Sequence, residues 1–325
     1  MPAAASGQTT PRRAFRAKAY ARPVPASRTG LLLGVAAYGI WGGFPLYWPL
    51  LAPSGAVEIL AHRIVWSLVT MAVLVAVTSR TGSFRAMLQD RRTTLLLVVA
   101  AATITANWGT YIYGVNSGRV VETSLGYFIN PLVTVLMGVL ILGERLRSLQ
   151  WVALGIGFVA VALLTWDYGR LPWVALVLAF SFGTYGLAKK SAGVGAVESL
   201  TFECTVIAPF ALGYLAWLGS AGDARFAGEG WGHVLLLMSS GVVTAIPLLC
   251  FGGAATRISM TSLGLLQYLA PILQFALGVT VLGEHMPPER WIGFGLVWLA
   301  LVVFTAEALH ARRRQLALVA ESTAA

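Results

Sequence analysis

Several ionisable residues lie inside long apolar segments of this chain. Arg63 comes seven positions after the start of an apolar run at residue 56, so a helix would bury it roughly 10 Å deep at 1.5 Å per residue. If the run crosses a membrane, a charge there costs about 2.5–3.5 kcal/mol on insertion scales and marks a binding site by default. Glu203 takes the equivalent place in a later run at 198–218.

Two arrangements of Arg63 and Glu203 are open. They could line one central cavity and meet a solute of mixed charge. Alternatively, a buried ion pair, Arg63–Glu203 or Arg63–Glu58, could hold the helices together. A pair that opens when the solute binds would combine both interpretations.

His62 and Glu122 could carry protons or bind a cation. His62 follows Glu58 by four positions, which places both on one helix face, and a histidine titrates near neutral pH. Each residue also has a structural interpretation, with His62 as a packing group and Glu122 as a first-turn acid favoured by the helix dipole. Both interpretations stay open.

Two prolines are expected to kink helices near the middle of the membrane. Pro131 follows Asn130 and leaves the carbonyl near Tyr127 without its helical partner, and Pro271 does the same near Gln267. Transporters build their sites from such interrupted helices. A simple packing kink is the alternative.

Aromatic side chains could bind a flat or cationic solute by stacking. Asn107, Trp108 and Tyr111 share one side of a predicted helix, and Tyr185 and Tyr268 add rings in other runs. Rings at the ends of runs are more often interface anchors, and we expect this of Trp48, Trp166 and Trp231. The candidate substrate-binding residues are therefore Arg63, His62, Asn107, Tyr111, Glu122, Tyr127, Asn130, Tyr185, Glu203, Gln267 and Tyr268.

The elements that position these residues are predicted to be membrane-spanning helices. Only 11% of the 325 residues are charged and 57% are hydrophobic, whereas about 25% of a soluble domain is charged. Apolar runs of helix-spanning length, 18 residues or more, recur at 31–51, 56–78, 94–115, 121–142, 149–166, 171–188, 198–218, 233–255, 259–282 and 291–309. The predicted fold is therefore all-α, with ten transmembrane helices.

Lys and Arg residues predict the orientation of these helices. Of the 23 basic residues, 18 lie on one side of the predicted membrane, four lie on the other, and Arg63 lies within a span. The basic side is cytoplasmic by the positive-inside rule, so both termini are expected to be cytoplasmic. The net charge of +10 is explained by this distribution, and nucleic acid is not an expected partner.

The chain contains an internal repeat with an offset of 140 residues. Pro131 and Pro271, Gly143 and Gly283, and Glu144 and Glu284 are among the pairs that share this offset. Because each copy holds five helices, an odd number, the second copy must enter the membrane from the opposite side. Such inverted repeats allow one half to rock against the other, which gives alternating access to a central site.

We expect a basic, disordered cytoplasmic tail at 1–29, a first five-helix repeat at 30–168, a second, inverted repeat at 169–309, and a cytoplasmic tail at 310–325. The chain has no P-loop and no zinc or Cys/His cluster, so no metal, cofactor or ATP site is expected. A secondary transporter, with a proton or another ion as the candidate coupling ion, is favoured over a passive channel and over a membrane-embedded enzyme.

Three strings carry a resemblance to a known family: AHRIVWS at 61–67, ETSLGYFINPL at 122–132 and LGER at 142–145. They resemble the RarD branch of the EamA drug/metabolite transporter superfamily over about residues 30–310. The resemblance implies a ten-helix, multi-pass permease of the bacterial inner membrane, linked to chloramphenicol sensitivity. We therefore expect an exporter of small metabolites or drugs that works as a monomer or homodimer, surrounded by lipid.

Overall fold

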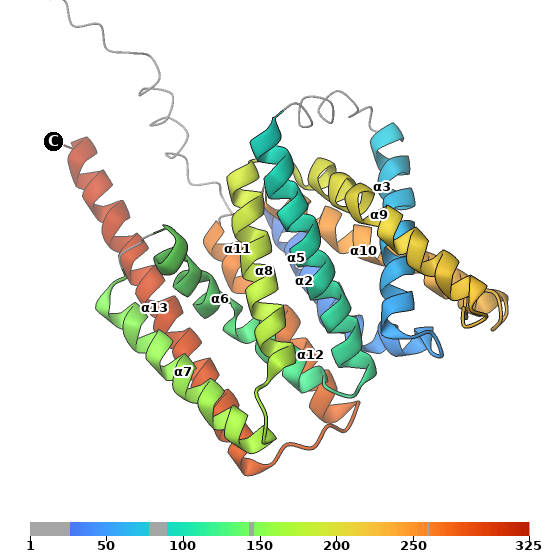
Figure 1. The fold of residues 1–325 in the computed structure, drawn as a ribbon. Helices are drawn as coiled ribbons and strands as arrows, with labels where there is room; N and C mark the ends of the chain where they lie inside the picture. Colours follow the sequence, from blue (N-terminus) through green and yellow to red (C-terminus); the bar gives the residue numbers. More distant parts are fainter. Residues whose placement is uncertain (1–26, 78–89, 143–145, 256, 259, 325) are drawn as a thin grey trace, which may run out of the picture.

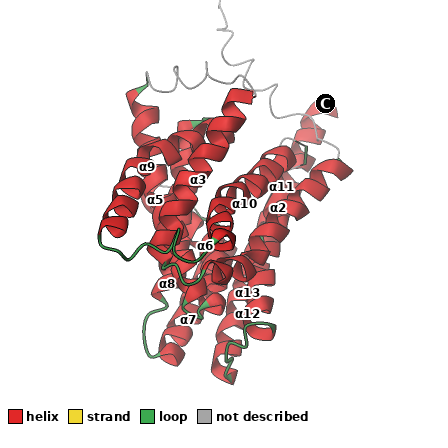
Figure 2. Cartoon of the chain, turned by 90° about the vertical axis from the view of Figure 1, so that its right-hand side faces the viewer, coloured by secondary structure: helices red, strands yellow, loops and turns green. Residues whose placement is uncertain are grey.

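The computed structural model describes residues 27–77, 90–142, 146–255, 257–258 and 260–324. The described part is helical and contains no strand, and short loops join the helices (Figure 2). The expected disordered tail at 1–29 lies almost entirely outside the described residues. The expected tail at 310–325 continues the last helix, which extends to Ala324.

The described residues of the first half of the chain form five long helices and one short one. They are α2 (Arg28–Tyr47), the 3-10 helix η1 (Trp48–Leu51), α3 (Ala56–Val77), α5 (Arg91–Asn116), α6 (Val120–Leu142) and α7 (Ser148–Tyr168). The second half contains α8 (Trp173–Ala192), α9 (Ala196–Ser220), α10 (Trp231–Ala255), α11 (Met260–Leu266), α12 (Leu269–Thr280) and α13 (Pro288–Ala324). These bounds follow the predicted apolar runs closely.

Eight of the described spans are long and apolar enough to cross a membrane. One of them is formed by α11 and α12 together. A ninth span is formed by Arg28–Gly42 and Phe44–Leu51, within α2 and η1, if these two segments, which are bent by 43° at Gly43, are counted as one. α8 is shorter in its apolar part, over Trp173–Lys189. The protein is therefore a polytopic membrane protein. In lipid no water is present to bond the backbone N–H and C=O groups, and a helix pairs these groups within its own segment.

The two prolines with the 140-residue offset act differently. The helix breaks at Gln267 and Tyr268, between α11 and α12, four and three residues before Pro271, as the missing proline N–H predicts. By contrast, α6 runs through Pro131 as one helix. Only the second predicted interruption therefore divides its helix in two.

The helices pack in a small number of recurring pairs (Figure 1). Nine pairs account for most of the packing among the described helices. They are α5·α8, α2·α10, α6·α8, α2·α12, α3·α10, α5·α9, α3·α9, α6·α12 and α7·α13. α3 packs between α9 and α10 and also contacts α5. Helices from both halves of the chain therefore surround the middle of α3, where Arg63 lies.

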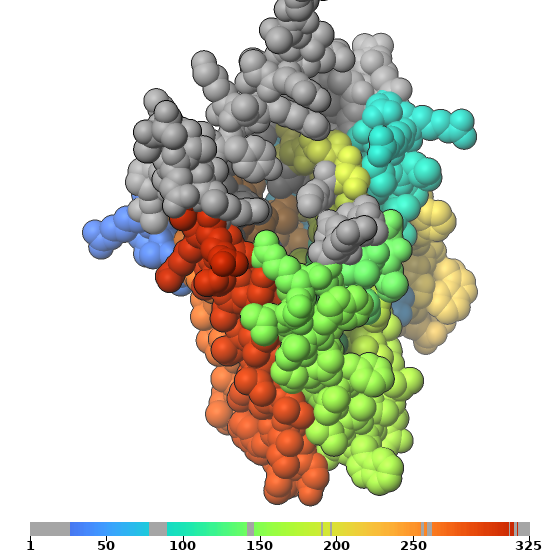
Figure 3. Space-filling model, turned by 90° about the vertical axis from the view of Figure 1, so that its left-hand side faces the viewer, coloured from blue at the N-terminus to red at the C-terminus, as the bar shows by residue number. Residues whose placement is uncertain are grey.

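Two ion pairs hold α7 and α13 together along one face of the molecule (Figure 3). Asp167 and Arg290 meet at one end of the pair, with Oδ2 and Nε 2.8 Å apart. Arg147 and Glu307 meet at the other end, at 2.7 Å. The acidic partners, Asp167 and Glu307, are 140 positions apart, and the arginines, Arg147 and Arg290, are 143 apart, so each link joins the start of one helix to a later part of the other.

Candidate substrate-binding site

Arg63 is buried in the middle of α3, with 3% of its surface exposed. Its Nε donates to Oγ1 of Thr244 on α10 at 3.0 Å. The Thr244 hydroxyl donates in turn to a backbone carbonyl one turn earlier, so its oxygen is free to accept. The guanidinium carbon lies 4.0 Å from the ring centre of Trp108 and 4.9 Å from that of Trp48. The phenyl ring of Phe44 lies farther away, at 5.8 Å.

The structure does not contain the ion pairs that were the structural alternative for Arg63. Within the described residues, Arg63 makes no ion pair with Glu203 or Glu58. The Glu58 carboxylate accepts instead from the backbone N–H of Arg225 at 2.8 Å. The carboxylate of Glu203 lies 3.3 Å from Nζ of Lys189. Helix rotation decides this outcome, because it directs Arg63 towards Trp108 on α5 and Thr244 on α10 rather than towards Glu203 on α9.

Glu203 belongs to a second polar cluster, formed by α8 and α9. Ser199, one turn earlier on α9, donates to the Glu203 carboxylate at 2.5 Å. Tyr185 on α8 donates to the same carboxylate at 3.3 Å, and its oxygen accepts from Lys189 at 2.7 Å. Three donors therefore stabilise a carboxylate that is almost fully buried.

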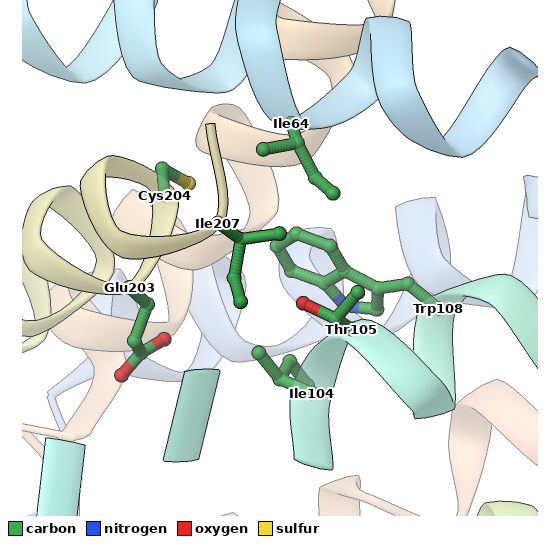
Figure 4. Close-up of a pocket in the computed structure, with 7 residues that line it drawn as sticks. All are labelled: Ile64, Ile104, Thr105, Trp108, Glu203, Cys204 and Ile207. Carbon is green, nitrogen blue, oxygen red and sulfur yellow. The ribbon is translucent and has the colours of Figure 1, made fainter. Parts of the chain in front are cut away.

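A small cleft lies between α3, α5 and α9 (Figure 4). Trp108 and Glu203 lie on opposite sides of this cleft, and its other walls are mostly apolar. The lining residues are Ile64, Ile104, Thr105, Trp108, Glu203, Cys204 and Ile207. Trp108 also stacks against Arg63, so this ring lies between the cleft and Arg63, which is not itself a lining residue.

A hydrogen-bond network on α5, α6 and α8 borders the Arg63 cluster. Asn107 donates to the carbonyl of Leu178 at 3.0 Å and to the hydroxyl of Ser181 at 3.1 Å. Its own carbonyl accepts from the Tyr127 hydroxyl at 3.2 Å. The rings of Tyr127 and Tyr111 meet edge to face, with centroids 5.7 Å apart. Four of the predicted residues, Arg63 included, therefore lie in one neighbourhood.

Comparison with known proteins identifies the family. The sequence pattern of the EamA-like transporter family matches the chain twice, over residues 28–166 and 171–306. The chain belongs to the EamA-like transporter family. It is a member of the RarD-like branch, since Protein RarD of Streptomyces exfoliatus is 58% identical over 287 residues, covering 88% of this chain and 91% of that protein.

Other relatives of this EamA-like transporter carry similar names. An uncharacterized transporter of Vibrio cholerae is 42% identical, with coverage of 89% of this chain and 96% of the relative. The Chloramphenicol-sensitive protein RarD of Pseudomonas aeruginosa is 32% identical, with coverage of 89% and 97%. A solved crystal structure shares the fold, with a TM-score of 0.55 and 20% identity over 85% of this chain and 98% of that one. The chain is therefore a membrane transporter.

In this EamA-like transporter, His62 lies apart from the Arg63 cluster. Its ring stacks on Phe226 of the α9–α10 loop, with centroids 4.5 Å apart and planes inclined by 20°. His233 on α10 is nearby and is hydrogen-bonded to Ser54 at 3.0 Å. His62 therefore packs under an end loop, which agrees with its structural interpretation.

Glu122 likewise lies at an end of the bundle. Its carboxylate pairs with Arg170 at 2.7 Å and accepts from the backbone N–H of Val174, in the first turn of α8, at 3.1 Å. Both carboxylate oxygens are engaged in this way. The geometry favours the structural interpretation of Glu122, because the residue joins the start of α6 to the start of α8.

Tyr127 lies beside Arg63, whereas Gln267 and Tyr268, at the break between α11 and α12, belong to another part of the bundle. Tyr268 packs against the core formed by α6, α7, α12 and α13, and its hydroxyl interacts with Thr305 and Gln267. Gln267 and Tyr268 therefore face α13. The side-chain carbonyl of Asn130 is buried and has no hydrogen-bond partner among the described residues.

Sequence reasoning missed three members of the site. Thr244 and Lys189 carry no signal of their own, because a threonine in an apolar run and a lysine at a run's end are both common. Trp48 was expected at the membrane interface, and this prediction is wrong, since the ring is fully buried beneath Arg63. Trp166 and Trp231 are 88% and 82% exposed, as interface anchors would be.

Proposed function

We propose that this chain is a secondary transporter that exports small metabolites or drugs across the bacterial inner membrane by alternating access. The observation that carries the proposal is the buried Arg63 cluster beside a cleft. Its helices come from both matches to the family pattern, α3 and α5 from the first, α9 and α10 from the second. A site between two repeats is where rocking of one repeat against the other would change its access.

The packing supports two inverted five-helix repeats, ten spans and cytoplasmic termini as parts of this proposal. In such a repeat each of the first five spans corresponds to one of the last five, for example α2 to α8 and α5 to α10, with α11 and α12 taken as one span. When every helix is replaced by its counterpart, each main packed pair becomes another main pair or stays the same; the pair α5·α8, for example, becomes α10·α2. The two ion pairs between α7 and α13 also exchange places. The excess of Lys and Arg on one side supports the orientation.

Flux from proteoliposomes tests the proposed function. Vesicles would be loaded with a mixture of small metabolites and chloramphenicol, and the loss of each compound would be followed by mass spectrometry with and without a proton gradient. We expect saturable, gradient-dependent loss of a subset of compounds, and at least tenfold slower loss for Arg63→Gln at equal reconstitution. Arg119→Gln, at the loop between α5 and α6, is the matched control.

Two outcomes contradict this function. Loss at the rate of protein-free vesicles would show that the chain does not move these solutes. A conductance that neither saturates nor responds to the gradient would instead indicate a passive channel.

A further inference from the structure

The charges around the cleft do not balance. Glu203 is neutralised by Lys189 at 3.3 Å. Arg63 makes one hydrogen bond, from Nε to Thr244, and within the described residues it has no carboxylate partner. Its terminal guanidinium nitrogens make no hydrogen bond to a described residue. The cleft region therefore has one uncompensated positive charge.

A buried charge without a counter-charge is costly. Removing a cation from water carries a large desolvation penalty, which is offset only when the geometry supplies a counter-charge and enough acceptors. The faces of Trp108 and Trp48 offset part of it through cation–π contact. Ring faces are only weak acceptors of N–H groups, however, so the terminal nitrogens keep their capacity to bind an anion.

We infer that the substrate is an organic anion with a flat apolar portion. Its carboxylate or phosphate would bind the terminal nitrogens of Arg63, whose fork geometry matches two oxygens of one anionic group. Its apolar portion would lie between α3, α5 and α9, against Trp108 and the isoleucines Ile64, Ile104 and Ile207. The cleft there, of about 10 Å³, holds roughly one water molecule, so these helices must move apart to admit a ring. Binding would bring the charge of the region to zero.

This inference rests on the proposed function, since it names the class of solute that the same site takes. The sequence predicted a solute that carries both charges, and the inference replaces it with a solute that carries only a negative charge. A cationic group on the solute would have needed Glu203, but Lys189 already occupies that carboxylate, together with Ser199 and Tyr185.

Three probes of one shape and different charge test the inference. Benzoate, benzamide and benzylamine would be titrated into the purified protein in phosphatidylcholine nanodiscs, with binding measured by calorimetry and by the unfolding temperature. We expect benzoate to bind and raise the unfolding temperature, and benzamide and benzylamine to bind at least tenfold more weakly. Arg63→Gln should weaken benzoate binding at least tenfold, which corresponds to loss of one charge-assisted contact.

Two further variants distinguish loss of the anion contact from a general loss of folding. Arg63→Lys keeps the charge but loses the fork, so it should bind benzoate with intermediate affinity. Arg119→Gln removes a cation that is stacked on Tyr113, outside the cleft, and should leave benzoate binding unchanged. Because the buried charge is unpaired in the empty protein, Arg63→Gln should unfold at the same or a higher temperature than the unsubstituted chain without ligand.

The inference is overturned if benzoate fails to bind, if benzamide or benzylamine binds as well as benzoate, or if benzoate binding survives Arg63→Gln. Competition by phosphatidylglycerol in the nanodiscs would assign the anion to a lipid headgroup and would also overturn it. Failure of the proposed function has a different signature, because benzoate would then bind at Arg63 while no compound leaves loaded vesicles. Export restricted to neutral or cationic compounds would keep the function and remove this substrate class.

Discussion

Lys189 connects the inner part of the bundle with the solvent-facing end of α8. Its side chain is 19% exposed, yet its ammonium group lies 3.3 Å from a Glu203 carboxylate that is 2% exposed. The ring of Tyr185 lies beneath the same ammonium group, 4.9 Å from Nζ. A lysine that charge counting places at the membrane surface therefore neutralises the carboxylate that lines the cleft.

Removing Lys189 should destabilise the protein, because the buried Glu203 carboxylate would then lack a counter-charge. We expect Lys189→Met to lower the free energy of unfolding by roughly 2–3 kcal/mol, less than for a fully buried pair because the lysine is partly exposed. Lys189→Met with Glu203→Gln should be less destabilised than the sum of the two single changes. Unfolding in mixed detergent micelles measures all four proteins, and Lys189→Arg is the conservative control. Strictly additive effects would show that the two groups do not interact.

At the scale of secondary-structure elements, the close contact between α3 and α10 determines how near Arg63 lies to Thr244. Gly241 on α10 lies directly against the backbone of α3. A methyl group at this position would overlap the carbonyl of Trp66 and lie 2.8 Å from the nitrogen of Ser67. Trp66 is one turn after Arg63, and Thr244 is one turn after Gly241. The close approach at this glycine therefore brings Arg63 to its acceptor.

A methyl group at Gly241 should force these two helices apart. We expect Gly241→Ala to destabilise the protein by about 2 kcal/mol, because backbone atoms cannot move aside as a flexible side chain would. Gly39→Ala on α2 is the matched control. The added methyl group meets no atom within 4 Å there, so the change should be neutral or slightly stabilising. Equal unfolding free energies for the two variants would contradict the predicted close contact.

At the scale of the whole molecule, one end of the bundle is closed by contacts between α6 and the segment that follows α12. The carboxylate of Glu284 accepts hydrogen bonds from the backbone N–H groups of Val120 and Val121, the latter at 2.9 Å. A carboxylate at a helix N-terminus satisfies amides that have no partner within the helix. Burial raises the pKa of the Glu284 carboxyl above its ordinary value. Gly278 approaches α6 at the same place.

Locking this end should stop transport without preventing folding. A β-carbon at Gly278 would lie 3.4 Å from that of Val120, close to the separation that a disulfide needs. In a background with Cys204 and Cys250 replaced by serine, we expect oxidised Val120→Cys/Gly278→Cys to lose flux almost completely and to regain it on reduction. Each single cysteine variant should transport under both conditions. Undiminished flux in fully cross-linked protein would contradict rocking of α6 against α12.

Much of the architecture could be read from contiguous stretches of sequence. The apolar runs predicted where the long helices lie, because 18 or more apolar residues in a row leave the backbone no partner except itself in lipid. The missing N–H of Pro271 predicted the break at Gln267 and Tyr268. Both properties belong to the local chain, so neither needs knowledge of what packs against it.

The site was only partly readable in this way. Burial cost singled out Arg63 and Glu203. The shared helix side with Trp108 singled out Asn107 and Tyr111, and the proline kink singled out Tyr127; these three residues lie near Arg63. Their partners depended on tertiary structure, since Thr244 is 181 residues from Arg63 and is one of several hydroxyls on apolar runs.

The sequence determined by itself that a buried cation exists, and the tertiary structure decided what surrounds it. The rotation of each helix about its own axis, and its depth against its neighbours, select which side chains meet. Those two quantities come from packing between segments far apart in the chain. For this reason Arg63 rests on Trp108 and Trp48, while Lys189 rather than Arg63 neutralises Glu203.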